Sequence, residues 1–125
     1  MGKESEMEQP RYEHFKRYDP AERYERQLKL EGWGDEAQKK LADATVIVAG
    51  AGGLGSPVSL YLTAAGVGKI ILWDYDEVAL SNLNRQILYA FDDIGSEKSP
   101  PGASHLNRLN PDIEVVAVST RITEE

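Results

Sequence analysis

An apolar run followed at once by closely spaced glycines constrains the fold of this chain more than any other feature. Residues 45–49 read TVIVA and residues 50–55 read GAGGLG, with the glycine spacing G-x-G-x-x-G. A continuous apolar run is typical of a buried strand in a parallel sheet. The glycines allow a tight turn, and they let the backbone approach a phosphate at the N-terminus of the following helix. The pattern predicts a strand, a phosphate-binding turn and a helix.

The acidic end of the next predicted strand, 69–73, strengthens this interpretation. Asp74 follows Gly55 by roughly the 20 residues that separate the glycines from the ribose-binding acid in dinucleotide-binding folds. Two alternatives stay open: a tight turn that binds nothing, and a polar strand terminus at Asp74. The candidate ligands for phosphate and ribose are Gly50, Gly52, Gly53, Gly55 and Asp74.

Two short helices are predicted before the first strand, and a further helix and strand after the second. Proline just inside a helix and an acidic residue just before it mark a helix start, whereas glycine marks an end. The predicted elements are a helix from the cap Asp19 to a break at 31–34, a helix from 36 to about 42 capped by Asp35, a helix over about 53–65 with Gly66 at C′, a helical turn from the cap Ser81 to Arg85, a helix that ends near 110–111 and a strand over 113–118.

These elements define an α/β fold: the N-terminal βαβαβ half of a Rossmann-like doubly wound parallel sheet, in strand order 3-2-1, preceded by two short helices. Residues 1–18 are polar and aperiodic, which predicts a flexible N-terminal arm before a partial nucleotide-binding domain at 19–125. A complete sheet of this kind continues beside its first strand. We therefore expect strand 45–49 at an open edge, with an apolar face uncovered.

Composition excludes several classes of function. The chain has no cysteine, so disulfides, thiolate zinc sites and a cysteine nucleophile are impossible within it. Its formal net charge of −7 argues against a nucleic-acid partner, which needs a basic face. No apolar run approaches the roughly 20 residues of a membrane span. We expect a cytoplasmic protein without a membrane partner, and no metal ligands are assigned.

A polar cluster after Asp74 points beyond an ordinary dinucleotide site. Residues 81–86 read SNLNRQ, which gives Asn82, Arg85 and Gln86, and Lys98 adds a second cation. Cations beyond the strand ends suit a polyphosphate, whose charge they offset. The alternatives are solvated surface charges at Arg85 and Lys98, and local turn caps at Asn82 and Gln86.

Several motifs together resemble one family. The chain is similar to the MoeB/ThiF/HesA-type activating enzymes, relatives of the ubiquitin-activating enzyme, over roughly residues 20–120. The resemblance implies that ATP and Mg²⁺ are used to adenylate the C-terminal glycine of a ubiquitin-like sulphur-carrier protein of the molybdopterin or thiamine pathway, and it implies a homodimer. The matching motifs are RYERQ at 23–27, GAGGLG at 50–55, AAGVGKIILWDYDEVALSNLNRQ at 64–86, IGSEK at 94–98 and LNP at 109–111.

The resemblance also implies roles for single residues. The loop, through Gly53, would contact phosphates, and Asp74 would hold the ribose hydroxyls. Arg26 resembles an arginine that reaches into the partner's nucleotide site. The residues implied to contact the phosphates and stabilise charge at the α-phosphate are Asn82, Arg85 and Lys98, with Gln86 as a polar neighbour.

The chain departs from the family pattern in two ways. Members continue for more than a further hundred residues, including the zinc ligands of many, so the present chain is expected to be poorly active by itself. The stretch SPPGAS at 99–104 follows Lys98 where the family runs directly into a helix, and its prolines and glycine predict a delayed helix start. Alternatives are a non-catalytic nucleotide-binding or subunit-pairing module, and an NAD-dependent oxidoreductase, which leaves Asn82 and Arg85 unexplained.

Overall fold

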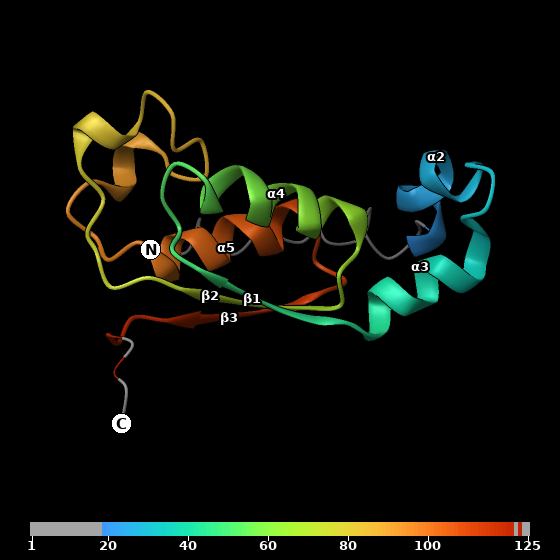
Figure 1. Ribbon diagram of the computed structural model, residues 1–125. Coiled ribbons are helices and arrows are strands. Elements are labelled where there is room, and N and C mark those ends of the chain that lie inside the picture. The colour runs from blue at the N-terminus through green and yellow to red at the C-terminus, as the bar shows by residue number, and fades with distance from the viewer. Residues whose placement is uncertain (1–18, 122, 124–125) are drawn as a thin grey trace, which may run out of the picture.

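The computed structural model describes residues 19–121 and 123, so the predicted arm at 1–18 lies outside the described residues. A three-stranded sheet carries two helices on one face, and a small helical unit lies beyond one end of the strands (Figure 1). With η marking 3-10 helices, the order is η1 (Pro20–Tyr24), α2 (Glu25–Leu28), α3 (Gly34–Asp43), β1 (Thr45–Ala49), α4 (Gly55–Ala65), β2 (Lys69–Trp73), η2 (Leu80–Asn82), η3 (Phe91–Asp93), α5 (Ser99–Leu109) and β3 (Glu114–Val118).

The sheet is parallel and has the predicted order, with β1 at one edge, β2 in the centre and β3 at the other edge. Ile47 pairs with Ile71, and Ile71 pairs with Val116. The two crossover helices α4 and α5 lie on the same face (Figure 1), because both connections advance across the sheet in the same direction. All carboxyl ends of the strands therefore meet at one end of the sheet.

The core lies between this helical layer and the covered face of the sheet. Ile70 and Leu72 of β2 are fully buried, and Leu106 of α5 is buried with them. Side chains alternate across a strand, so Ile47 points to the other face, where it is 57% exposed. The prediction of an edge position for strand 45–49 is confirmed, and Ile47 marks the apolar surface expected there.

Helix starts are where the sequence-based predictions fail. Asp19 caps η1 as predicted, since its Oδ1 accepts from the Ala21 N–H at 3.0 Å. The prediction that Asp35 caps the second helix is wrong, because α3 already begins at Gly34, after a turn closed by the Trp33 N–H on the Leu30 carbonyl at 3.1 Å. Asp35 lies instead in the first turn, where an acidic side chain complements the helix dipole.

Two other elements begin later than predicted, because the loops before them extend further along the chain. The helix after the glycines begins at Gly55 rather than Gly53, and β3 begins at Glu114 rather than residue 113. Ser81 lies inside η2 and is not its cap. Asn82 closes that turn, since its Oδ1 accepts from the Ala79 N–H at 2.9 Å.

The predicted delay after Lys98 is also wrong, because α5 begins at the next residue, Ser99. Pro100 and Pro101 occupy the first turn, where a backbone N–H has no intrahelical partner and proline is tolerated. Gly102 is required by packing, since a Cβ there would lie 2.6 Å from Leu72 Cδ2. The prolines and glycine thus start the helix and bring it close to the sheet.

Candidate functional site

The loop between β1 and α4 depends on glycine at its two ends. Gly50 has a φ of +98°, in the left-handed region that other residues avoid. A Cβ on Gly55 would lie 1.7 Å from the Gly50 carbonyl oxygen, so no larger residue fits there. The Gly50 N–H donates to the Trp73 carbonyl at 2.7 Å, which ties the loop to the end of β2.

Ala51, inside this loop, is fully buried and held on both sides. Its N–H donates to Asp74 Oδ2 at 2.7 Å, and its carbonyl accepts from the Tyr89 hydroxyl at 2.6 Å. The other oxygen of Asp74, Oδ1, accepts from the Asp76 N–H at 2.7 Å. Asp74 therefore braces the loop, a role that the sequence did not indicate. Each carboxylate oxygen keeps a further acceptor position, so a contact to ribose stays chemically open.

Tyr89 contacts the loop of the candidate site and was not among the residues predicted from the sequence. Burial, followed by the nearby carboxylates of Asp74 and then Asp93, raises the pKa of the Tyr89 phenol above its ordinary value. The hydroxyl consequently stays protonated and donates to the loop. The available signal was an aromatic residue three positions after Gln86, in a segment whose polar residues had already been singled out.

Arg85 and Gln86 lie against the two central glycines of the loop. A Cβ on Gly53 would be 3.7 Å from Arg85 Nε, and one on Gly52 would be 3.6 Å from Gln86 Nε2. Arg85 is exposed, and its guanidinium donates to the Ser81 carbonyl at 3.1 Å. The fold therefore brings the predicted cation to the predicted loop.

Gln86 and Asn82 have different surroundings. Gln86 is buried, and its Oε1 has no hydrogen-bond partner within the described residues. An unpaired buried oxygen of this kind calls for a partner. Asn82 uses Oδ1 for the Ala79 N–H and its carbonyl for the Gln86 N–H at 2.9 Å. The capping alternative therefore applies to Asn82, and its side-chain amide nitrogen remains as a donor.

Lys98 lies at the start of α5 with only 6% of its surface exposed. Its N–H donates to the Asp76 carbonyl at 2.8 Å, which joins it to the same strand end as Asp74. In the part of the chain that the structure describes, no carboxylate lies within ion-pair distance of its ammonium group. An enclosed lysine whose ammonium group has no carboxylate partner can form a charge-assisted contact with a bound anion.

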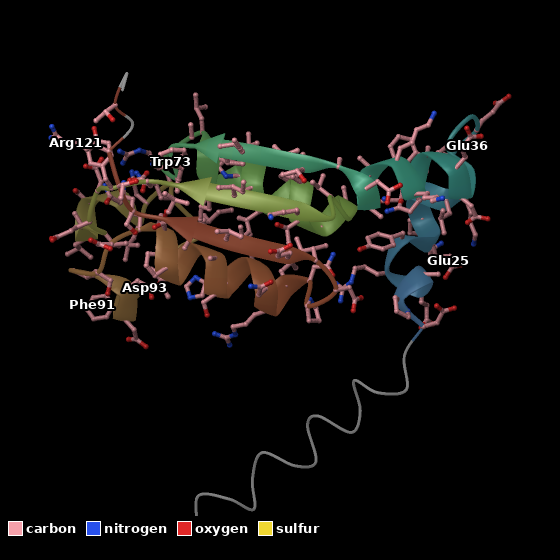
Figure 2. The ribbon with its side chains drawn as sticks, turned by 90° about the horizontal axis from the view of Figure 1, so that it is seen from below. Glu25, Glu36, Trp73, Phe91, Asp93 and Arg121 are labelled. Carbon is pink, nitrogen blue, oxygen red and sulfur yellow. The ribbon has the colours of Figure 1, made fainter. Side chains whose placement is uncertain are left out.

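Arg26 is the one predicted site residue that the chain does not bring to the loop. It is exposed on α2, in the unit beyond the amino ends of the strands (Figure 1). Figure 2 shows its neighbour Glu25 at the opposite end of the molecule from Trp73 and Asp93. Gln27 Nε2 fixes this unit by donating to the Ala65 carbonyl at 2.8 Å.

Two negative findings apply to residues 19–121 and 123. No group of three or more His, Asp or Glu side chains is placed to hold a metal ion. None of the helices has both the length and the apolar character needed to cross a membrane.

The parallel half-sheet, its glycine loop and the two cations beside it define a Rossmann-like α/β protein with a candidate nucleotide site. The chain belongs to the ThiF family, whose model matches residues 24–125. It is 48% identical over 103 residues to the sulfur carrier protein ThiS adenylyltransferase of Escherichia coli strain K12, covering 82% of this chain and 41% of that protein. It is 46% identical over 104 residues to the sulfur carrier protein adenylyltransferase of Thermus thermophilus, covering 83% and 38%.

Solved structures agree with the fold. The structure of Escherichia coli MccB with ATP is 36% identical at a TM-score of 0.75, covering 82% of this chain and 32% of that one. The Escherichia coli tRNA N6-threonylcarbamoyladenosine dehydratase TcdA with AMP is 36% identical at a TM-score of 0.70, covering 73% and 37%. The predicted Rossmann-like fold is confirmed. The chain spans about two fifths of the length of the curated relatives described above.

Proposed function

We propose that this chain forms the ATP-binding part of an adenylyltransferase that activates the C-terminal glycine of a ubiquitin-like sulphur-carrier protein. The observation that carries the proposal is Lys98, a largely enclosed lysine at the strand end that also holds Asp74, whose ammonium group pairs with no carboxylate of the described residues. Relatives named as sulfur-carrier adenylyltransferases and the similar ATP-bound MccB structure support it. A nicotinamide site has less need of two cations, which weighs against the NAD-dependent oxidoreductase.

In the proposed reaction a carboxylate oxygen of the carrier attacks the α-phosphorus of ATP. The new P–O bond gives an acyl adenylate. The bond from the α-phosphorus to the bridging oxygen breaks, so that pyrophosphate leaves with the electron pair. The glycine loop and the N-terminus of α4 hold phosphate oxygens, and Asp74 holds the ribose. Arg85 and Lys98, with Asn82 and Gln86 as polar neighbours, offset the charge that develops at the α-phosphate.

Mg²⁺ accompanies ATP in this proposal, but the described residues do not fit a dedicated metal site, since no group of three acidic or histidine side chains is present among them. No step is derived from the ion. Arg26 lies too far from the loop of its own chain to act there, so we place it in the nucleotide site of a partner copy within a homodimer. The net charge of −7 disfavours a nucleic-acid partner, and a cytoplasmic location is part of this proposal.

Calorimetric titration of the 125-residue chain with ATP–Mg²⁺ and with NAD tests the nucleotide assignment. We expect tighter binding of ATP, because two cations and the loop amides oppose a triphosphate. Tighter binding of NAD contradicts the proposal. Carrier-dependent exchange of pyrophosphate into ATP, measured on a form of the protein as long as its relatives, separates an enzyme from a non-catalytic binding or subunit-pairing module.

A further inference from the structure

Tyr89 touches the glycine loop directly although it is not among the expected nucleotide ligands. Its ring is buried, with 7% of the residue exposed, and it packs beside Gly102 of α5. Its hydroxyl donates to the Ala51 carbonyl at 2.6 Å. Ala51 is completely buried, so water cannot replace this donor.

The Ala51 carbonyl belongs to the same peptide group as the N–H of Gly52. A trans peptide group is planar, and its C=O and N–H point to opposite sides. The described chain contains no cis peptide bond. Holding the carbonyl toward Tyr89 therefore directs the Gly52 N–H away from the tyrosine. Among the backbone hydrogen bonds of the described residues, none uses the Gly52 N–H as donor.

Tyr89 is the last residue of the segment 85–89, which is hydrogen-bonded to the start of α4 as well as to the loop. The Leu88 N–H donates to Ser56 Oγ at 2.9 Å, and the Tyr89 N–H donates to the Gln86 carbonyl at 3.2 Å. Ser56 is buried in the first turn of α4, directly after the loop. The segment that carries Arg85 and Gln86 is thus fastened to the loop by Tyr89 and to the helix by Leu88.

We propose that Tyr89 is a positioning residue, which holds the Ala51–Gly52 peptide group so that the Gly52 N–H is presented to the phosphates of the nucleotide. This inference rests on the proposed function. Tyr89 itself contacts no phosphate and acts only through the loop. Losing its hydroxyl should weaken the hold on phosphates and leave the hold on the nucleoside unchanged.

The test compares Tyr89→Phe with Tyr24→Phe in the full 125-residue chain. Tyr24 provides a matched control, because its hydroxyl accepts a 2.9 Å hydrogen bond from Nδ2 of the buried Asn110, which also donates to the Thr63 carbonyl in the last turn of α4, at the end of that helix away from the loop. Calorimetry measures affinities for ATP and for adenosine, and amide exchange of Ala51, whose N–H is bonded to Asp74, is followed without nucleotide. We expect Tyr89→Phe to weaken ATP binding by about tenfold, the size of one modest hydrogen bond.

We also expect Tyr89→Phe to leave the adenosine affinity unchanged and to accelerate exchange at Ala51, whereas Tyr24→Phe should alter neither the ATP affinity nor this exchange. ATP affinity equal to that of the wild type overturns the proposal, and so does an equal loss for ATP and adenosine. Should the wild-type chain bind no ATP, the proposed function fails and this inference fails with it. A difference between wild type and variant tests Tyr89 alone.

If Tyr89→Phe folds poorly, Ser56→Ala provides a second variant. It removes the acceptor of the Leu88 N–H and lets the same segment move away from the loop. A selective loss of ATP affinity supports the proposal, and an unchanged ATP affinity overturns it.

Discussion

Lys98 shows at the scale of single residues how an environment, rather than a residue type, identifies a site. A lysine in a sequence is usually a solvated charge. Here the residue is buried beside the end of β2, and the described residues supply no carboxylate to pair with its ammonium. In the proposed complex this ammonium group would pair with a phosphate of the nucleotide.

Lys98→Met should separate the contribution of this ammonium group to nucleotide binding from its contribution to stability. Methionine keeps the length of the side chain and removes the charge, so the free energy of unfolding should stay the same or rise. ATP affinity should fall by about tenfold or more, because a charge-assisted contact is lost. Urea unfolding and calorimetry measure the two quantities, with the exposed Arg108→Met as the control for charge loss on the same helix. A loss of stability above about 1 kcal/mol together with unchanged ATP binding would return Lys98 to a structural role.

The phenol of Tyr89 predicts a pH dependence. Because burial raises its pKa in the folded protein, the unfolded chain loses this proton first, near its ordinary pKa of about 10. The contribution of the phenol is fully present below that pH and is lost as the pH rises toward the folded pKa. The stability difference between wild type and Tyr89→Phe should shrink above about pH 10, by at most about 1.4 kcal/mol per unit.

Urea unfolding of both proteins between about pH 8 and about pH 11 gives this difference directly. Tyr24→Phe serves for comparison, since it removes a different tyrosine hydroxyl. A difference that stays constant through the alkaline range would mean that Tyr89 ionises equally in the folded and unfolded chains.

At the scale of the secondary-structure elements, glycines allow neighbouring segments of backbone to pack closely against each other. Gly68, between α4 and β2, donates its N–H to the Leu41 carbonyl of α3 at 3.0 Å, and a Cβ there would lie 1.7 Å from the Ala42 carbonyl oxygen. At Gly102 of α5 the nearest obstacle is the end of the Leu72 side chain. Side-chain ends can shift more easily than a backbone that is fixed by hydrogen bonds.

Gly68→Ala should therefore destabilise the fold more than Gly102→Ala. We expect Gly102→Ala to cost about 1–3 kcal/mol through overpacking, offset in part by the better helix propensity of alanine. Gly68→Ala should exceed that loss, since α3 must move away from β2. Urea unfolding of the two variants decides the order, and the reverse order would show that α3 is loosely attached.

At the scale of the whole molecule, the described residues leave one face of the sheet without helices (Figure 1). Ile47 is exposed in the middle of the edge strand β1 and pairs with Ile71 of β2, which in turn pairs with Val116 of β3. An apolar surface of this kind on an edge strand favours self-association. We expect the 125-residue chain to form oligomers, most simply dimers, at micromolar concentration.

Ile47→Lys should shift this equilibrium toward the monomer with little change in stability, because the side chain is already largely exposed. Sedimentation velocity measures the distribution of monomers and oligomers. Leu30→Lys, which changes another exposed apolar residue but outside the sheet, provides the control. A wild-type chain that stays monomeric at these concentrations contradicts the expectation.

The distance between α2 and the loop leads to a prediction for the dimer. In a form as long as its relatives, Arg26→Ala and Arg85→Ala should each lose pyrophosphate exchange, Arg85→Ala by about 2–4 kcal/mol of transition-state stabilisation. If Arg26 acts in the partner's site, mixing the two variants should restore activity, because one site of a mixed dimer keeps both arginines. If the two variants are folded but do not complement each other, Arg26 either acts with Arg85 of its own chain or does not act in the nucleotide site.

The sequence alone determined the order of elements, the strand order and the loop with its acidic partner. These follow from local patterns: an apolar run, glycine spacing and a charged strand end, each legible within some thirty residues. Helix starts were harder to predict from the sequence, because the prolines and glycine of SPPGAS can either delay a helix or begin one. In the structure these residues begin the helix, with both prolines in its first turn.

Only the tertiary structure decided what each candidate site residue contacts. The burial of Lys98, the bracing of Ala51 by Asp74 and the contact of Tyr89 with the loop join residues of different elements. Sequence spacing does not encode such distances, since they depend on how α5 and the segment 86–89 pack on the sheet. Arg26 lies on α2, at the other end of the sheet, so it does not reach the loop of its own chain.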